Sequence, residues 1–182
     1  MTSNDPLGIA VVGCGGMAGS HLRAYRELAQ SAPGLITVSA TCDVDESRAR
    51  RAAAEVAAFQ PAAPRVYTDY RRLLDEHRPA AVDLVLPHNV HHTFVVEALD
   101  AGAHVLVEKP LAVSMAAGRQ MLEKHERACQ RSPIVFAVAE QYRRRLEERA
   151  NCWAIRDAGL IGEPRMIFSQ RVNLSMGLIV GT

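Results

Sequence analysis

The stretch Ile9-Ala10-Val11-Val12-Gly13-Cys14-Gly15-Gly16-Met17-Ala18-Gly19-Ser20-His21 decides the fold. Four apolar residues run directly into a glycine cluster, and a segment with helical spacing follows. This order is typical of a buried parallel strand that brings the chain to a phosphate group. Gly13 and Gly15 permit a tight turn close to a pyrophosphate, and Ala18 takes the third position, where Gly or Ala fits. Glycine-rich turns also occur for geometric reasons alone, so the rest of the chain must support this interpretation.

The composition is that of an ordinary soluble globular protein. The 182 residues are 48% hydrophobic and 23% charged, with a formal net charge of +1. Such a balance offers no sequence-wide field to attract nucleic acid or an anionic membrane, so neither is predicted as a partner. The length suffices for one core and the beginning of a second domain.

The sequence predicts a cytoplasmic protein with reduced thiols. No apolar run approaches a membrane span, and residues 1–5 lack the basic start and apolar region of a secretory signal. The cysteines form no CxxC pair, which argues against a disulfide framework or a zinc site and favours small core residues. They are Cys14, Cys42, Cys129 and Cys152.

Strand and helix patterns alternate along most of the chain. Predicted strands cover residues 9–12, 35–42, 66–67, 82–86, 104–107 and 134–139. In the second of these, we expect Ile36, Val38, Ala40 and Cys42 to point the same way. Predicted helices follow the glycine loop, span residues 45–58, start at a Thr68 cap, contain residues 94–99 and run from a Ser114 cap to about residue 130. The alternation predicts an α/β fold, a Rossmann-type parallel sheet with helices on both faces.

The first domain is predicted to span residues 1–143. Residues 144–182 would begin a second, α+β domain, in which a helix ends at Gly159 and residues 166–172 form a first strand. The chain then stops, and we expect a truncated reading frame or a domain fragment.

Asp43, at the end of the second predicted strand, has two interpretations. Its carboxylate can accept hydrogen bonds from the ribose hydroxyls of NAD, and it would repel the 2′-phosphate of NADP. Alternatively, Asp43 or Asp45 caps the following helix. We favour the ribose role for Asp43 and capping for Asp45. Three arginines on that helix form a solvated face or meet a 2′-phosphate, which keeps NADP open: Arg48, Arg50 and Arg51.

Gly13, Asp43, Pro87 and Lys109 each follow a different predicted strand. Ligands of doubly wound parallel sheets bind outside the carboxyl ends of the strands. This agreement across four units supports the glycine loop as a nucleotide site.

At this point the chain resembles the Gfo/Idh/MocA family of oxidoreductases, named for glucose-fructose oxidoreductase and inositol dehydrogenase. The resemblance covers nearly the whole chain. It rests on the glycine loop with Met17, Ala18 and His21, on Asp43, and on residues 66–70 (VYTDY), 87–91 (PHNVH), 101–110 (AGAHVLVEKP), 140–143 (EQYR) and 159–164 (GLIGEP).

The resemblance implies a role for Lys109 beside the nicotinamide and the substrate hydroxyl, where an ammonium can stabilise developing negative charge and an amine can relay a proton. It also implies that Glu108 helps to position the site and that Pro110 follows a cis bond. His21 would pack or hydrogen-bond rather than react. The implied cofactor-binding residues are Gly13, Gly15, Gly16, Met17, Asp43, Pro87, Asn89, His91, Glu108 and Lys109.

The histidines of residues 88–92 invite a metal interpretation, but no carboxylate or cysteine completes a ligand set nearby and no HExxH spacing exists, so no metal is predicted. Two functions remain open. The first is the cofactor half of an NAD(P)-dependent oxidoreductase for a sugar, polyol or related small molecule, with a homo-oligomer expected for a complete version. The second is a non-catalytic dinucleotide-binding or assembly module, because the family's substrate-holding domain is largely missing from the 182 residues.

Overall fold

The computed structural model describes residues 5–166 and 168. It divides the chain into two compact units, Met1–Glu140 and Gln141–Thr182. The first unit ends slightly before the boundary that the sequence predicts at residue 143.

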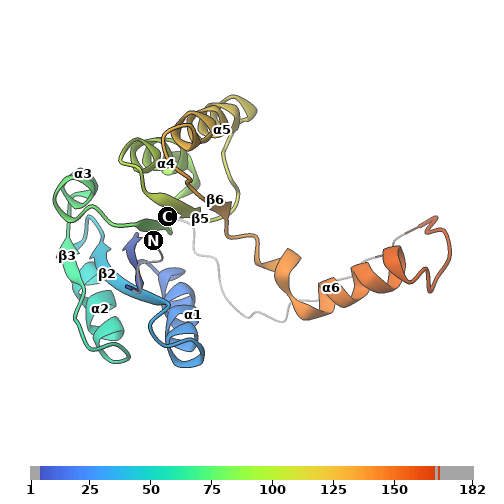
Figure 1. Ribbon diagram of the computed structural model, residues 1–182, viewed down its shortest axis with the longest axis horizontal. Helices are drawn as coiled ribbons and strands as arrows, with labels where there is room; N and C mark the ends of the chain where they lie inside the picture. The colour runs from blue at the N-terminus through green and yellow to red at the C-terminus, as the bar shows by residue number, and fades with distance from the viewer. Residues whose placement is uncertain (1–4, 167, 169–182) are drawn as a thin grey trace, which may run out of the picture. The chain divides into compact units, whose positions relative to one another are not determined.

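The first unit contains the predicted Rossmann-type sheet (Figure 1). Six strands pair in the order β3-β2-β1-β4-β5-β6, and every pair is parallel. The order reverses direction at β1, so the carboxyl ends of β1 and β4 flank a crevice of the kind in which such sheets bind ligands. The strands are β1 (Leu7–Val12), β2 (Ile36–Cys42), β3 (Arg65–Tyr67), β4 (Ala81–Leu84), β5 (His104–Val107) and β6 (Phe136–Val138).

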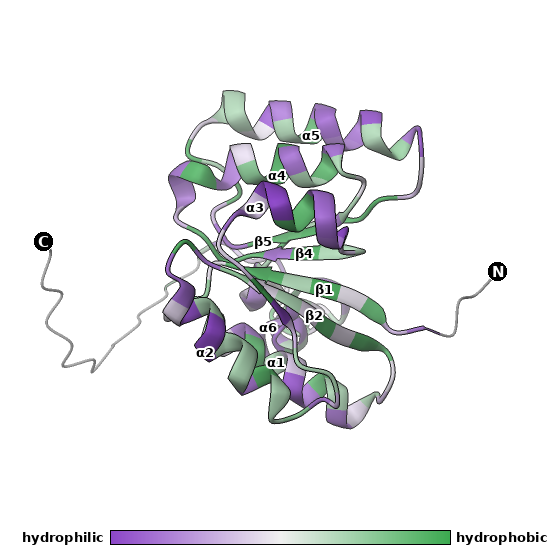
Figure 2. Ribbon diagram, turned by 90° about the vertical axis from the view of Figure 1, so that its left-hand side faces the viewer, coloured by the Kyte–Doolittle hydropathy of each residue, from purple (hydrophilic) through white to green (hydrophobic). Residues whose placement is uncertain are grey.

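Helices cover both faces of this sheet (Figure 2). The helices α1 and α2 lie on one face, while α3, α4 and α5 lie on the other. No helix in the described part of the chain is long and apolar enough to cross a membrane. The bounds are α1 (Ala18–Ser31), α2 (Glu46–Ala57), α3 (Tyr70–Arg72), the π-helical turn η1 (Leu73–His77), the 3-10 turn η2 (His88–Val90), α4 (His91–Asp100) and α5 (Met115–Cys129).

Side chains at the helix starts explain several of these boundaries. Asp45 caps α2 and Ser114 caps α5, as predicted, each accepting a hydrogen bond from a backbone N–H two or three residues on. For α3 the prediction of a Thr68 cap is wrong, because the carboxylate of Asp69 takes that position. Either side chain can cap a helix, so composition alone did not distinguish them.

An irregularity in β2 overturns the expectation that its alternate residues share one face. Ile9 pairs with Val38 and Ala10 pairs with Ala40, so Ser39 is an extra residue in the ladder. A β-bulge of this kind reverses the side-chain alternation beyond it. Val38 therefore packs with α1 and α2, while Ala40 packs in the cluster on the opposite face.

The two faces carry separate hydrophobic clusters. The cluster beneath α1 and α2 contains Val11, Leu22, Val38, Ala49 and Val56. The larger cluster beneath α3, α4 and α5 contains Val12, Leu73, Leu84, Leu99 and Met121. Since burying one such side chain stabilises a fold by roughly 1.5–3 kcal/mol, these clusters hold the strand ends that form the site.

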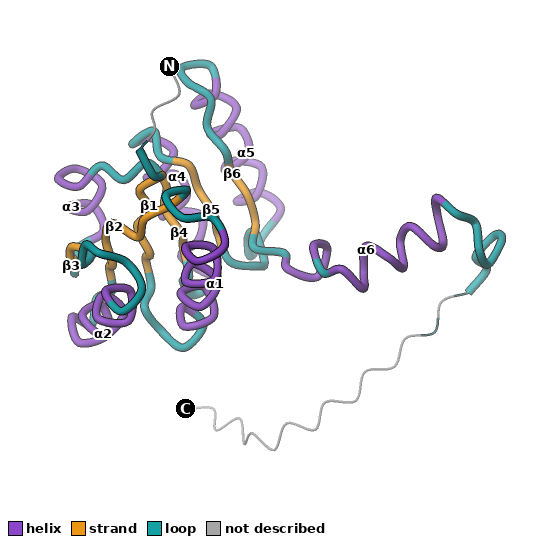
Figure 3. The backbone as a smooth tube through the Cα atoms, turned by 60° about the horizontal axis from the view of Figure 1, so that its bottom comes forward, coloured by secondary structure: helices purple, strands orange, loops and turns teal. Residues whose placement is uncertain are grey.

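The second unit is mainly helical where it is described. It contains the 3-10 turn η3 (Gln141–Arg144), α6 (Leu146–Cys152) and the π-helical turn η4 (Trp153–Asp157), and Figure 3 shows these as purple segments followed by a loop. The left-handed Gly159 follows, as the sequence predicts for a helix end. The predicted strand at residues 166–172 lies outside the described residues, apart from Met166 and Phe168.

Candidate functional site

The carboxyl ends of β1, β4 and β5 are joined by hydrogen bonds that continue beyond the strands. The amide of Val85 donates to the carbonyl of Val12 at 2.8 Å, and the amide of Glu108 donates to the carbonyl of Leu84 at 3.0 Å. Three loops therefore leave the sheet side by side: the glycine loop, the Pro87 loop and the loop that carries Lys109.

Gly13 is the one glycine of the loop that the fold itself requires. Its φ of +90° lies in the left-handed region, and a Cβ built on it would lie 2.2 Å from the carbonyl oxygen of Val85. A Cβ on Gly15 or Gly16 would meet no atom of the described residues within 4 Å. The fold tolerates a side chain at those two positions, so the open space above them suits a ligand that approaches the backbone.

The loop leads to a helix start without a side-chain cap. Met17 occupies the cap position of α1 and makes no capping hydrogen bond, and the first turn has no acidic residue. The positive end of the helix dipole therefore faces the glycine loop without an acidic side chain in the first turn to neutralise it, although the amides of Ala18 and Ser20 already donate to the carbonyls of Gly15 and Met17. Together with the open surface at Gly15, this arrangement fits a pyrophosphate.

Asp43 is fastened to the glycine loop by its own carboxylate. One oxygen accepts the amide of Cys14 at 2.7 Å, and the other accepts the amide of Asp45 at 2.9 Å. Each carboxylate oxygen has a further lone-pair direction, so Asp43 can still accept hydrogen bonds from two neighbouring hydroxyls. The contact also places the acidic residue next to the turn at Gly13, where a ribose and a pyrophosphate of one molecule could be held together.

A cavity of about 650 Å³ opens beside these groups. It brings together four of the predicted site residues, Gly13, Gly15, Asp43 and Pro87. The other predicted residues do not line it: Gly16, Met17, Asn89, His91, Glu108 and Lys109. Further lining residues that sequence reasoning missed include Thr68, Asp69, Tyr70, Thr93, Phe94 and Glu97.

Arg48 also lines this cavity. Its guanidinium lies 3.3 Å from the carboxylate of Asp45, while Arg50 forms an ion pair with Glu46. Of the three arginines singled out in the sequence, Arg48 is the one that lines the cavity, where it can meet a phosphate near Asp43.

Lys109 lies on the neighbouring loop, half-buried. The Lys109–Pro110 peptide bond is cis, as the family resemblance implies. Glu108 has one carboxylate oxygen 3.0 Å from Nε2 of His21, and its other oxygen accepts the backbone amide of Lys109 at 2.9 Å. Glu108 thus ties the lysine's backbone to helix α1.

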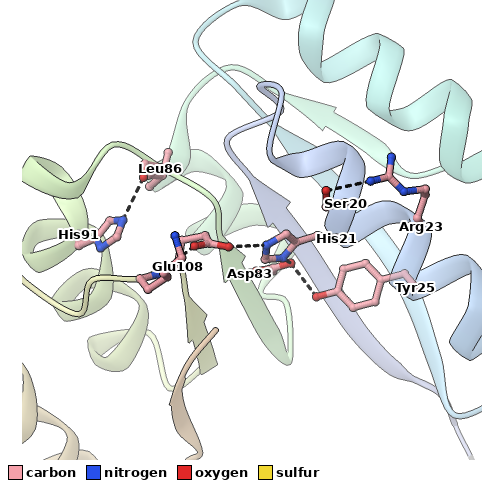
Figure 4. Close-up of polar contacts among 9 residues, drawn as sticks. Ser20, His21, Arg23, Tyr25, Asp83, Leu86, His91 and Glu108 are labelled. Atoms are coloured by element: carbon pink, nitrogen blue, oxygen red, sulfur yellow. Dashed lines mark hydrogen bonds and ion pairs between the residues drawn. The ribbon is translucent and has the colours of Figure 1, made fainter. Parts of the chain in front are cut away.

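His21 bridges two carboxylates (Figure 4). Its Nδ1 lies 2.8 Å from Oδ2 of Asp83, and its Nε2 faces Glu108. The same Asp83 oxygen accepts the Tyr25 hydroxyl at 2.8 Å. Asp83 is completely buried in β4, and its Oδ1 has no hydrogen-bond partner among the residues that the structure describes. Of the two roles expected for His21, packing or hydrogen bonding, the structure shows hydrogen bonding.

These surroundings control the charge of His21. Burial of the ring lowers its pKa, but the hydrogen bond and charge of Asp83, followed by those of Glu108, outweigh burial and raise the pKa to about 9. At neutral pH the ring is therefore an imidazolium between two carboxylates. Burial, together with the negative charge of Asp83, raises the pKa of Tyr25, so its hydroxyl remains a donor.

His91 does not line the cavity, contrary to the prediction. Its side chain is completely buried at the first residue of α4, and its two ring nitrogens lie 3.0 Å from the carbonyl oxygens of Pro110 and Leu86. The spacing correctly placed His91 near a strand end, but the helix start turns the ring inward. His91 therefore joins the Leu86–Pro87 loop to the loop that carries Lys109.

The cysteines divide into two kinds. Cys14 and Cys42 are buried beside the glycine loop, as expected. Burial and then the nearby charge of Asp43 raise the pKa of Cys14 to about 12. The expectation is wrong for Cys129 and Cys152, which are exposed. Among residues 5–166 and 168, no cluster of three or more histidine, cysteine or acidic side chains is arranged to hold a metal ion.

Asp83 was missed by sequence reasoning, although a carboxylate inside the apolar run Val82-Asp83-Leu84 is a detectable signal. Charged residues are rarely fully buried unless they are paired. Such an acid therefore indicates a buried partner, but the partner's identity depends on how α1 crosses β4.

Replacing Asp83 with Asn should lower the free energy of unfolding by about 2 kcal/mol at pH 7, because it removes the charge that receives two hydrogen bonds. His21 also makes wild-type stability depend on pH: its folded pKa of about 9 exceeds the ordinary 6.5. Its contribution is complete below pH 6.5 and is lost as the pH rises through 9. We expect a wild-type loss of roughly 2 kcal/mol over that range and a smaller loss in Asp83→Asn.

Urea unfolding followed by circular dichroism at several pH values measures both effects. Circular dichroism is preferable to fluorescence because the sole tryptophan, Trp153, lies in the second unit. If the free energy of unfolding falls equally steeply with pH in the wild-type protein and in Asp83→Asn, Asp83 does not hold the His21 proton.

A glycine turn with an uncapped helix behind it, an acid at the end of the adjacent strand and a cavity between them define a dinucleotide-binding domain of the Rossmann class. Residues 7–134 match the family described as "Oxidoreductase family, NAD-binding Rossmann fold", GFO_IDH_MocA. The chain belongs to this Gfo/Idh/MocA family, which confirms the resemblance found in the sequence.

Relatives of known activity support this membership. The chain is 30% identical to D-apiose dehydrogenase of Paraburkholderia graminis over 85% of its own length and 37% of that protein. It is also 30% identical to inositol 2-dehydrogenase of Salmonella typhimurium over 93% of its length and 47% of that protein. The chain thus spans less than half the length of these curated relatives.

Solved structures of oxidoreductases are also similar to this chain. An NAD-binding oxidoreductase from Klebsiella pneumoniae is similar with a TM-score of 0.73 and 30% identity, over 87% of this chain and 40% of that one. An oxidoreductase from Agrobacterium radiobacter, solved with NAD⁺, L-tartaric acid and magnesium, gives a TM-score of 0.74 and 25% identity over 87% and 42% of the two chains.

Proposed function

We propose that this chain carries the cofactor half of an oxidoreductase that transfers a hydride between NAD and a hydroxyl or carbonyl carbon of a sugar, polyol or related compound. The observation that carries the proposal is that Asp43, the glycine loop and the Pro87 loop line one cavity, with Lys109 on the next loop. Bound NAD supplies the acceptor or donor carbon for the hydride.

Each part of the dinucleotide has a matching group in this chain. The Asp43 carboxylate binds the adenosine ribose hydroxyls, and the amides of the glycine loop and α1 bind the pyrophosphate. Pro87 and Asn89 belong to the loop that continues from β4, and they bind the nicotinamide half. Gly16 and Met17 are exposed at the loop surface, where they cover the pyrophosphate.

Lys109 acts on the substrate oxygen in this proposal. When a hydride leaves an alcohol carbon, negative charge develops on its oxygen, and an ammonium group stabilises that charge. In the opposite direction the same group donates a proton. Glu108 acts through the lysine's backbone amide and so positions it.

The substrate class is supported by the relatives, which are dehydrogenases of D-apiose, inositol and, in Pseudarthrobacter phenanthrenivorans, levoglucosan. All three compounds carry several hydroxyl groups. We propose a polyhydroxylated substrate for this protein, and a homo-oligomer as its assembly. We also propose a cytoplasmic location, which the four free cysteines support, since oxidising compartments favour disulfides.

Asp43 should set the choice between the two cofactors. We expect the wild-type chain to bind NADH at least about tenfold more tightly than NADPH, because the carboxylate repels a 2′-phosphate. Asp43→Ser should reduce this preference to less than about threefold, because the 2′-phosphate can then approach Arg48 without repulsion from the Asp43 carboxylate. Fluorescence titration of both cofactors measures the ratio.

Asp45→Ser is the matched control, because it also removes a carboxylate near the cavity while serine still caps α2. This variant should retain the NADH preference. If NADPH binds the wild-type chain as tightly as NADH, the ribose role of Asp43 is excluded.

The oxidoreductase itself is tested with the chain extended to the length of its relatives. Such a protein should produce NADH from NAD⁺ with at least one member of a panel of inositols, pentoses and anhydrosugars. Tight NADH binding without turnover across the panel would favour the non-catalytic dinucleotide-binding module instead.

A further inference from the structure

The bridge formed by His21 is assembled from three elements of the first unit. His21 comes from α1, Asp83 from β4 and Glu108 from the loop after β5, and Figure 4 shows the imidazole between the two carboxylates. The side chains of His21 and Glu108 are each 12% exposed, and that of Asp83 is 0% exposed. Screening by solvent is therefore weak at this bridge.

The chemistry of the partners fixes the state of the ring. Ionised carboxylates only accept hydrogen bonds, so both ring nitrogens must carry a proton to satisfy them. Tyr25 supplies one more donor to Asp83, and it adds no charge. The three ionisable groups in contact thus total one positive and two negative charges, and losing the positive charge would leave two buried carboxylates facing each other.

This charge is connected to the proposed catalytic group by a single residue. Glu108 uses one carboxylate oxygen for His21 and the other for the amide of Lys109. If the ring were absent, the Glu108 carboxylate would lose its fixed orientation and its compensating charge. Both changes would affect Lys109, because the same carboxylate accepts the backbone amide of Lys109.

We propose that His21 is a positioning residue for Lys109, holding the Glu108 carboxylate in place beside the lysine's backbone and balancing the charge of that carboxylate. The proposal rests on the proposed function of Lys109, but its test requires neither cofactor nor turnover.

The chain offers an unusually direct readout, because it contains only two lysines, Lys109 and Lys124. Reductive methylation with ¹³C-formaldehyde labels both, and NMR titration then gives the pKa of each dimethylamino group. In His21→Gln we expect the pKa of Lys109 to rise by about half a unit or more, since uncompensated carboxylate charge favours the protonated amine. The pKa of Lys124, which pairs with Asp100 on α4, should not change.

A matched control is His77→Gln, which removes a half-buried histidine that hydrogen-bonds Ser39 away from Glu108. It should leave Lys109 unchanged. An unchanged Lys109 pKa in His21→Gln, or an equal shift at Lys124, would overturn the proposal.

A second measurement on the wild-type chain covers the case in which His21→Gln does not fold. The ring ¹⁵N shifts of His21 should show both nitrogens protonated at pH 7.5, and the backbone amide of Lys109 should shift with the same midpoint as the ring. His77 serves as an internal reference, since burial and then the charge of Arg65 lower its pKa. The proposal is overturned if the His21 ring is neutral at pH 7.5, or if the chemical shift of the Lys109 amide does not change as the His21 ring titrates. Absent NADH binding would overturn only the proposed function.

Discussion

Gly13→Ala lowers the free energy of unfolding of the first unit by about 4 kcal/mol. Two independent costs add at this position. A left-handed φ costs a residue with a Cβ about 1–2 kcal/mol, and the new Cβ would collide with the Val85 carbonyl oxygen, 2.2 Å away. The obstacle is backbone between adjacent strands, so relieving the collision means separating the ends of β1 and β4, at a further cost of about 1–3 kcal/mol.

Gly15→Ala separates the role of the fold from that of the ligand. In the described part of the chain nothing lies within 4 Å of a Cβ at Gly15, so the free energy of unfolding of Gly15→Ala should stay within about 0.5 kcal/mol of wild type. Its NADH affinity should nevertheless fall at least about tenfold, because the backbone can no longer approach the pyrophosphate. Urea unfolding and NADH titration of both variants test this contrast. Gly13→Ala at wild-type stability would contradict the left-handed turn.

The elements and the edge of the site were predictable because their signals are local. An apolar run followed by glycines marks β1 and its turn, and a carboxylate after an apolar run marks Asp43. Each needs only a few neighbouring residues. The rule that parallel strands present their carboxyl ends at one edge then brings Gly13, Asp43, Pro87 and Lys109 together without any knowledge of side-chain packing.

The features that sequence reasoning missed depend on contacts between distant segments. The bulge at Ser39 is a property of how β2 pairs with β1, and no pattern inside β2 shows it. The burial of His91 depends on two backbone carbonyls offered by separate loops. The Asp83 bridge needs α1 to cross β4 at one particular point. The periodicity of apolar residues identifies which face of a helix or strand is buried, but it does not identify the distant residue that a side chain on that face will contact.

Lys109→Ala should reduce turnover by at least about a thousandfold in the chain extended to the family's length, while the NADH dissociation constant changes less than twofold. A group that stabilises developing charge or transfers a proton typically contributes 10²- to 10⁴-fold, and Lys109 is proposed to do both. Because the ammonium acts on the substrate oxygen, its loss leaves the contacts to ribose and pyrophosphate intact.

Lys124→Ala is the matched control, because it removes the other lysine of the chain from a surface ion pair with Asp100; it should retain full turnover. Lys109→Arg separates the two contributions. Arginine keeps the positive charge but does not release a proton near neutral pH, so partial activity would assign the main effect to charge, and activity as low as that of Lys109→Ala would assign it to proton transfer. Turnover by Lys109→Ala within tenfold of wild type would exclude the lysine from the chemistry.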